Sequence, residues 1–205
     1  MAVDWCGIVD GEARAVGTFQ SQWGPCTIVT CPEGILSVDW GGALGQPMEQ
    51  ALAKRDRHTE RKTEAADGEN ESSTDSRIES DEVRISQAAL FAEAAIEQLE
   101  QYFAGSRHSF TLPLVLRGTE FQKSVWKYLT EIPYGETRSY GDVARAIGRD
   151  KAVRAVGQAN RRNPIPIVVP CHRVIGSHGE LTGYAGSQVH LKAALLNLER
   201  GIGQD

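Results

Sequence analysis

The chain has 205 residues, of which 40 % are hydrophobic and 24 % charged, an ordinary composition for one large or two small globular domains. Its first ten residues carry Asp4 and Asp10 and lack the apolar core of a signal peptide, and no apolar run approaches membrane-spanning length. Four irregularly spaced cysteines are too few for a disulfide scaffold, so we expect a protein of the reducing cytoplasm, without a membrane partner.

The net charge of −5 conceals an uneven distribution along the chain. Residues 113–205 hold 13 Lys and Arg against 8 Asp and Glu, whereas residues 53–82 hold 6 against 10. A basic C-terminal half indicates a polyanionic partner, and ordinary scatter of surface charge is the alternative.

Residues 1–45 predict β-strands. The runs 27–30 and 35–40 are rich in β-branched and apolar residues, and residues 32–34 between them are a hairpin signal. We therefore expect an antiparallel sheet in this part of the chain.

The composition changes sharply over residues 53–82, where sixteen of thirty residues are charged and Ile78 is the only large aliphatic residue. Such a segment cannot bury enough apolar surface to offset its ordering entropy, so we predict a disordered acidic insertion. A polar helix crossed by ion pairs is the alternative.

Residues 83–104 predict an amphipathic helix that ends at Gly105. Its apolar face consists of Phe91, Ala94, Ala95, Leu99, Tyr102 and Phe103. The β-favouring residues 110–112 then predict a short strand before Pro113.

Capping signals open the helices of the C-terminal half. Thr119 and Gln122 form a capping box before an apolar face, and Pro133 stops that helix. Ser139 is the expected N-cap of a short helix over 140–147, which Gly148 closes.

A turn and a second helix, reaching about residue 161, follow that short helix. This helix carries Lys151, Arg154, Arg161 and Arg162, and the pair has the shape of a helix-turn-helix, although most such pairs bind no DNA. Ser187 is the expected cap of a last helix that buries Leu191, Ala194, Leu195 and Leu198 and carries Glu199 near its end.

The segment Pro170-Cys171-His172-Arg173-Val174 follows a stiff run that contains Pro164 and Pro166 and cannot be helical. The aliphatic residues between the prolines are expected to be buried. A cysteine beside a histidine and an arginine suits a reactive thiol, because neighbouring cations favour the thiolate. Pairing of adjacent side chains needs a turn or a bridging water, and Glu199 is available to orient His172. An inert buried cysteine is the alternative.

Two further patterns are weaker. The glycine-rich residues 176–187 predict either a loop close to a ligand, on which Tyr184 could stack, or a plain hairpin turn. Cys26 and Cys31 have part of a metal-site spacing, but no second pair completes it, so we expect these cysteines, like Cys6, to be small core residues.

Taken together, these residues resemble the O6-alkylguanine-DNA alkyltransferase family, strongly over 83–200 and loosely over 1–45. The matching motifs are Asn163-Pro164-Ile165-Pro166-Ile167-Val168-Val169 before Pro170-Cys171-His172-Arg173-Val174, Phe121-Gln122-x-x-Val125-Trp126, Ile132-Pro133-Tyr134-Gly135-Glu136-Thr137, Ser139-Tyr140, Arg154-Ala155-Val156-Gly157 and Gly183-Tyr184-Ala185-Gly186.

The resemblance implies an α+β fold. An N-terminal α/β domain, ribonuclease H-like with an antiparallel sheet, would cover 1–112, and a mostly helical domain with a winged helix-turn-helix would cover 113–205. The implied function is direct-reversal DNA repair, in which the alkyl group of O6-alkylguanine passes irreversibly to Cys171, once per molecule. O4-alkylthymine remains an open second substrate. The resemblance implies double-stranded DNA as the partner, a monomer, no cofactor and no required metal.

The resemblance also implies roles for individual residues. Cys171 would attack the alkyl carbon, His172 would act as its base through water, Glu199 would orient His172, and Tyr140 would donate a hydrogen bond to the leaving guanine. Arg154 would replace the flipped base in the duplex, Asn163 would be a hinge, and Lys151, Ala155 and Arg161 would lie at the DNA. Tyr184, Ala185, Val174 and Pro166 would form the base pocket, in which some relatives have a serine at the position of Ala185.

Two other classes remain open on the sequence. A non-catalytic module that recognises alkylated DNA lacks the acceptor cysteine, so Cys171 argues against it. A Cys-His hydrolase would turn over many times and need no DNA, and the helix-turn-helix with Arg154 argues against that class.

Overall fold

The computed structural model describes residues 3–40, 71–181 and 189–202, with residues 71–78 described by their secondary structure only. Its elements are β1 (Val3–Val9), β2 (Glu12–Ser21), β3 (Gly24–Cys31), β4 (Gly34–Trp40), α2 (Glu71–Phe103), α3 (Glu120–Leu129), β5 (Arg138–Ser139), α4 (Tyr140–Ala146), α5 (Val153–Arg161), the 3-10 turn η1 (Cys171–Arg173), β6 (Val174–Ile175) and α6 (Val189–Glu199). No helix in these ranges is long and apolar enough to cross a membrane.

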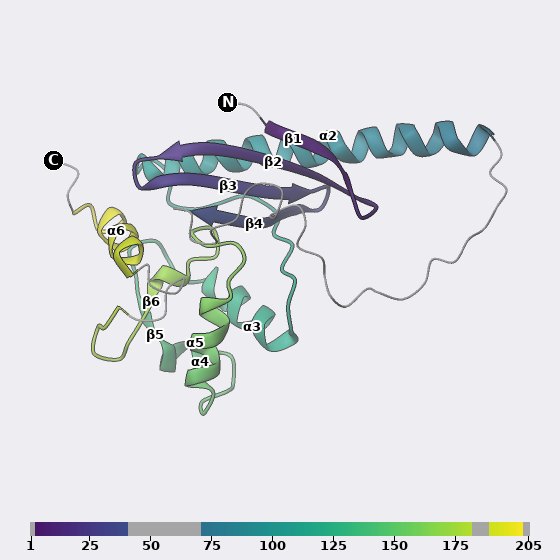
Figure 1. Cartoon of the computed structure of the whole chain (residues 1–205). Helices are drawn as coiled ribbons and strands as arrows, with labels where there is room; N and C mark the ends of the chain where they lie inside the picture. The colour runs from purple at the N-terminus through teal and green to yellow at the C-terminus, as the bar shows by residue number, and fades with distance from the viewer. Residues whose placement is uncertain (1–2, 41–70, 182–188, 203–205) are drawn as a thin grey trace.

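The N-terminal half is a four-stranded antiparallel sheet in the order β1-β2-β3-β4, with α2 along one face (Figure 1). The predicted hairpin at 32–34 is confirmed, because Cys31 pairs with Gly34 across the turn. Gly34 has φ of 140°, and a Cβ there would lie 2.3 Å from the Pro113 carbonyl oxygen, so only glycine fits.

The contact between α2 and the sheet depends on small residues. A Cβ at Gly17 would lie 2.7 Å from Cδ1 of Ile96, and Thr30 Oγ1 donates a 2.6 Å hydrogen bond to the Ala88 carbonyl. Because Gly17 has no side chain, the helix packs close to the strands. The buried face of α2 consists of Ala88, Ala92, Ala95, Ile96, Leu99, Tyr102 and Phe103, whereas Phe91 and Ala94 are only half-buried.

Two expectations are wrong in detail. α2 begins at Glu71 rather than near residue 83, so residues 71–82 are helical; the rest of the predicted insertion, 53–70, lies outside the described residues. Residues rich in Glu, Arg and Ser can continue an existing helix without burying apolar surface.

Residues 110–112 form no strand, and only Leu114 bridges to Ile35 of β4. Pro113 has no N–H, so the pairing cannot extend back along the chain.

The C-terminal half consists of α3, α4, α5 and α6 around the short parallel pair of β5 and β6. The predicted capping box of Thr119 with Gln122 on α3 is confirmed, and so is Ser139 as the N-cap of α4, where the structure adds Asp142 to form a second capping box. The expected cap Ser187 lies outside the described residues. α4 and α5 follow each other in the chain and pack against each other, as predicted for the helix pair.

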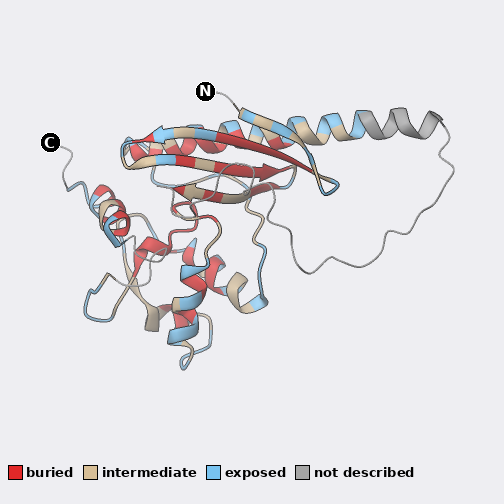
Figure 2. Cartoon of the chain, viewed as in Figure 1, coloured by how far each residue is buried: buried red, intermediate tan, exposed pale blue. Residues whose placement is uncertain are grey.

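The two halves share one apolar core. A single cluster of buried residues extends from Ile28 and Trp40 of the sheet, through Tyr102 of α2, to Trp126 and Cys171. Figure 2 shows this burial along the sheet and again in the segment between α5 and β6. The Val38 N–H also donates to the Pro164 carbonyl at 3.0 Å. The segment that precedes Cys171 is therefore packed directly against the N-terminal sheet.

Candidate active site

The run before Cys171 is buried, as its composition predicts: Ile165, Ile167 and Val169 are fully enclosed. Asn163 fixes its path, because its Nδ2 donates to the Val169 carbonyl at 2.7 Å and its Oδ1 accepts from the Ile165 N–H at 3.0 Å. Ile167 has φ of 75°, a strained conformation for a β-branched residue, and it is completely buried.

The turn that the sequence requires for a Cys-His pair is present. Cys171 opens the 3-10 turn η1, so the Cys171 and His172 side chains do not alternate as they would in a strand. Cys171 is 3 % exposed. Burial raises the pKa of its thiol to about 11, against the opposing effects of the Asn163 side chain and the Lys192 charge. The resting sulfur is therefore a protonated thiol that needs a base.

Glu199 lies beside His172, as predicted. Its Oε1 lies 2.7 Å from His172 Nε2 and accepts a 2.8 Å bond from Arg173 Nη2, while its Oε2 accepts from the Gly135 N–H at 2.9 Å. The Arg173 guanidinium also donates to the Ile132 carbonyl at 2.6 Å. The charged pair is thus enclosed and hydrogen-bonded on both sides, which is the condition for burying an ion pair.

The protonation states follow from these contacts. Burial alone would raise the pKa of Glu199, but hydrogen bonds from His172 and Arg173 outweigh it and hold that pKa well below its usual range. Burial lowers the pKa of His172 despite the carboxylate. His172 is therefore neutral, with its proton on Nε2 facing Glu199 and a lone pair on Nδ1. Among the residues that the structure describes, Nδ1 has no hydrogen-bond partner.

Lys192 is the residue that sequence reasoning missed. It lies on α6, is fully buried, and its Nζ donates to the Val174 carbonyl and lies 3.5 Å from the Tyr140 hydroxyl. Burial lowers its pKa to about 8, against the attraction of Cys171. Lysine is rarely buried, so a sequence gives little reason to place it in a site. The position of Lys192 among the leucines of α6 was the only feature of the sequence that indicated its burial.

Lys192 connects two predicted site residues. Its Nζ lies 5.7 Å from the centroid of the Tyr140 ring, and its positive charge acts to lower the pKa of the Cys171 thiol. The carbonyls of Val174 and Cys171 already accept hydrogen bonds, the first from Lys192 and the second from Asn160 Nδ2 at 3.0 Å. The Cys171 carbonyl also accepts from the Val174 N–H, so both carbonyls are held in place by hydrogen bonds within the site.

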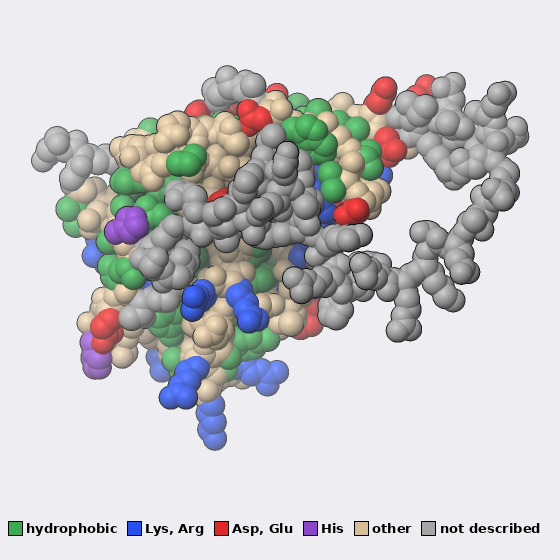
Figure 3. All heavy atoms as spheres, in the orientation of Figure 1, with side chains coloured by type: hydrophobic (Ala, Val, Ile, Leu, Met, Phe, Trp, Pro, Cys, Tyr) green, Lys and Arg blue, Asp and Glu red, His purple; other side chains and the backbone are tan. Residues whose placement is uncertain are grey.

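The side chains predicted to contact DNA are on the surface. Lys151, Arg154, Ala155 and Arg161 are all exposed on α5 or the turn before it. Figure 3 shows Lys and Arg side chains gathered at the end of the molecule where α4 and α5 lie. Asn163 follows α5 directly and bonds to the segment that leads to Cys171, so it connects the basic helix to the thiol.

The predicted base pocket is described only in part. Tyr184 and Ala185 lie outside the described residues. Val174 is buried in β6 and Pro166 is half-buried, bridged to Val169.

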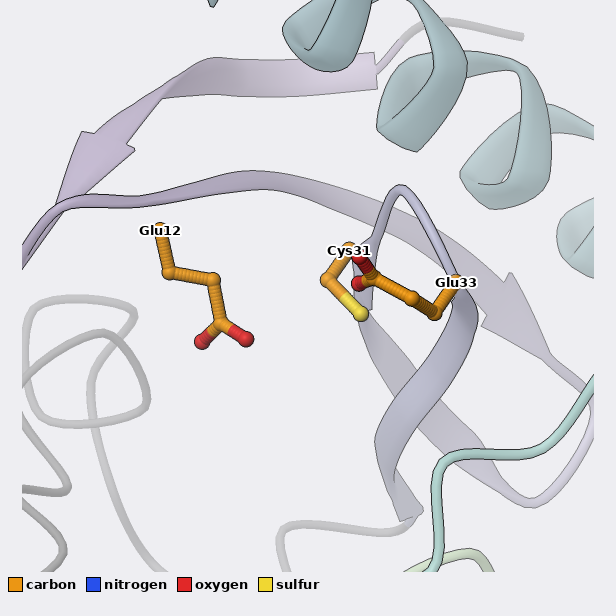
Figure 4. A group of neighbouring side chains, drawn as sticks. All are labelled: Glu12, Cys31 and Glu33. Carbon is orange, nitrogen blue, oxygen red and sulfur yellow. The ribbon is translucent and has the colours of Figure 1, made fainter.

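One group of side chains has metal-ligand chemistry: Glu12, Cys31 and Glu33 offer ligand atoms within 4.8 Å of one another (Figure 4). Glu12 already binds the guanidinium groups of Arg14 and Arg117. Burial, followed by Glu33, raises the pKa of the Cys31 thiol to about 11, so this sulfur is a poor metal ligand. These three residues do not fit a cation, and the absence of a required metal remains a prediction.

The fold and site together define a protein with a buried Cys-His-Glu set behind a basic helix pair. Two family models match this chain: "6-O-methylguanine DNA methyltransferase, ribonuclease-like domain" over residues 15–116 and "6-O-methylguanine DNA methyltransferase, DNA binding domain" over residues 120–201. The chain belongs to the 6-O-methylguanine DNA methyltransferase family.

Individual relatives agree with this assignment. The constitutive methylated-DNA–protein-cysteine methyltransferase of Bacillus subtilis is 63 % identical over 106 residues, which are 52 % of this chain and 64 % of that protein. The Methanosarcina acetivorans methylated-DNA–protein-cysteine methyltransferase is 58 % identical over 60 % of this chain and 78 % of its own length. A crystal structure of Mycobacterium tuberculosis OGT in complex with DNA is 37 % identical, with a TM-score of 0.63, over 90 % of this chain and 91 % of that one.

Proposed function

We propose that this protein repairs DNA by moving the alkyl group of O6-alkylguanine irreversibly onto Cys171, once per molecule. The observation that carries the proposal is the hydrogen-bonded order Glu199–His172 beside a buried thiol. A neutral histidine with its proton fixed toward a carboxylate is ready to accept another proton at Nδ1. The relatives named above are methylated-DNA–protein-cysteine methyltransferases, which agrees with this chemistry.

In the proposed reaction the Cys171 sulfur forms a bond to the alkyl carbon while the bond from that carbon to guanine O6 breaks. The thiol proton passes to His172 Nδ1 through a water molecule. The leaving guanine takes up negative charge, which the Tyr140 hydroxyl stabilises by hydrogen bonding before the base is protonated. Lys192 adds a buried positive charge beside both groups, which favours the thiolate and the departing base.

Access to the lesion requires the guanine to leave the helix stack. We propose that α5 lies against double-stranded DNA, with Lys151, Ala155 and Arg161 near the backbone and Arg154 filling the space of the flipped base. Asn163 would act as the hinge between that helix and the active-site segment. Tyr184, Ala185, Pro166 and Val174 would then enclose the extruded base.

We further propose a monomer that acts in the cytoplasm, with a winged form of the helix pair and a division into residues 1–112 and 113–205. The basic balance of the second part suits phosphate binding. The shared core between the parts argues for one cooperative unit despite this division.

The direct test is intact and peptide mass spectrometry after incubation with duplex DNA that contains O6-methylguanine. We expect one added CH2 on the peptide that carries Cys171, saturating at one per chain. Cys171→Ala should abolish the addition and leave DNA binding intact. Cys6→Ala should change neither, because Cys6 is exposed on β1 and the expectation that it is a core residue is wrong. An unmodified, folded, DNA-binding wild-type chain would contradict the proposal, and multiple turnovers per Cys171 would indicate a hydrolase.

The role of Arg154 has its own test. Arg154→Ala should slow repair of duplex DNA far more than alkylation by free O6-benzylguanine, because only the duplex requires base flipping. Equal losses with both substrates would show that Arg154 does not assist flipping.

A further inference from the structure

The Cys-His-Glu set belongs to the C-terminal half, but one of its hydrogen-bond partners comes from the N-terminal half. The hydroxyl of Tyr102, in the last turn of α2, donates to Glu199 Oε1 at 2.7 Å and lies 3.4 Å from His172 Nε2. Tyr102 is fully buried. It is separated from Glu199 by 97 positions in the chain, so only the tertiary fold brings the two together.

The Tyr102 ring is held by aromatic neighbours on several sides. It lies edge-on to Phe103 at 5.7 Å and to Tyr134 at 6.1 Å, and it packs against Phe110 at 5.5 Å between ring centroids. Burial, and then the Glu199 charge, raise the pKa of its phenol well above the usual value. The hydroxyl therefore keeps its proton at neutral pH and donates to the carboxylate, which can only accept.

We propose that Tyr102 is a positioning residue for alkyl transfer: its hydroxyl limits how tightly Glu199 holds the His172 proton, and so sets the pH at which His172 becomes a base. The inference rests on the proposed function, because it assigns a role within the same site. It also gives the N-terminal half a direct part in the chemistry.

The argument depends on competition for one oxygen. Glu199 Oε1 accepts hydrogen bonds from Tyr102, His172 and Arg173. A carboxylate that loses one donor attracts the remaining positive charge more strongly, so protonated His172 becomes more stable. Without the Tyr102 hydroxyl, the unprotonated imidazole that accepts the thiol proton should form only at higher pH.

Other groups also act on this pair, and none of them replaces the Tyr102 hydroxyl. From η1 comes Arg173, from α6 comes Lys192, and from the loop before β5 comes the Gly135 N–H. Of the tyrosines near Glu199, Tyr134 directs its hydroxyl elsewhere, to the Leu198 carbonyl at 3.4 Å. The His108 ring stacks on the Tyr134 ring, with 4.1 Å between the ring centroids.

The test is an NMR titration of the His172 imidazole in unreacted protein, assigned with His172→Gln. Tyr102→Phe should move the His172 titration to higher pH by about one unit, the size expected for one hydrogen bond to a charged group. The ascending limb of the alkyl-transfer rate against pH should move by a similar amount. Tyr134→Phe, which removes a neighbouring hydroxyl that does not bond to Glu199, should leave both unchanged.

A second substitution keeps the proposal testable if Tyr102→Phe does not fold. 3-Fluorotyrosine at position 102 is nearly the same size and is a stronger donor, so it should move the His172 titration to lower pH. An unmoved His172 titration in the folded variant would overturn the role of Tyr102. A wild-type protein that transfers no alkyl group would instead overturn the proposed function, and it would leave the titration result interpretable by itself.

Discussion

Replacement of Glu199 by glutamine tests the buried network most directly. The substitution keeps the size of the side chain and removes its charge. The Arg173 side chain, 7 % exposed, would then keep its positive charge with only neutral acceptors beside it, the Ile132 carbonyl and the oxygen of the new amide. One half of the new amide is a donor, and it would face the donors that now converge on the carboxylate from His172 and Tyr102.

The expected loss can be estimated from the geometry. Breaking a buried ion pair by removing one partner costs about 3–5 kcal/mol, because the other charge stays buried without compensation. The Glu199 side chain is 0 % exposed, so solvent screening does not reduce this figure. Since the folding free energy of a domain is typically about 5–15 kcal/mol, Glu199→Gln should weaken the protein severely.

The pH dependence has a definite sign. The folded-state pKa of Glu199 is lowered, so its contribution to stability is present above the unfolded pKa of about 4.3 and is lost as pH falls through the folded pKa. The free energies of unfolding of wild type and Glu199→Gln should therefore differ fully at pH 7 and converge as the solution is made acidic. Urea denaturation at a series of pH values measures this difference.

A matched control uses the same substitution at an exposed pair. Glu136 bonds to Arg138 at 2.8 Å, but these side chains are 51 % and 36 % exposed. Glu136→Gln should therefore change stability little. Equal, small losses for Glu136→Gln and Glu199→Gln would refute the claim that the Glu199 network is buried and coupled. In folded Glu199→Gln protein, alkyl transfer should also slow by roughly a hundredfold or more, because His172 loses its orienting anion.

Two further predictions concern single contacts. Lys192→Met should raise the pKa of the Cys171 thiol and slow its labelling by iodoacetamide, measured by peptide mass spectrometry. Lys123→Met, on the exposed face of α3, should not change the labelling rate. Equal labelling rates for the two variants would show that Lys192 exerts no electrostatic effect on the sulfur. Gly34→Ala should destabilise the fold by clearly more than the roughly 1 kcal/mol expected of a left-handed backbone alone, because the added Cβ meets a backbone carbonyl. Gly11→Ala, with φ of 75° and nothing within 4 Å, should show only that smaller cost in thermal denaturation, and similar losses at both glycines would contradict the clash.

The N-terminal half shows where sequence patterns fail. The hairpin at 32–34 was predictable because a turn depends on residues that are adjacent in the chain. The start of α2 and the missing strand at 110–112 were not. A charged run can be helical or disordered, depending on what it continues, and a β-favouring tripeptide becomes a strand only if a partner strand is free beside it.

The sequence by itself determined the features that depend on local chemistry. Capping boxes fixed the starts of α3 and α4, prolines excluded a helix before Cys171, and the Cys-His-Arg motif identified the reactive segment. The sequence also indicated Glu199 as the partner of His172, and the structure shows the contact between the two side chains.

Only the tertiary structure decided which remote polar groups surround that motif. Tyr102 and Lys192 lie at helical positions that read equally well as ordinary core or surface residues. Their functions arise from burial, because water would screen the interactions of an exposed phenol or ammonium group. In the folded protein the Tyr102 hydroxyl donates to Glu199, and the Lys192 charge acts on the Cys171 thiol. Burial brings distant parts of the chain together and strengthens their electrostatic coupling, and neither effect can be read from a local pattern.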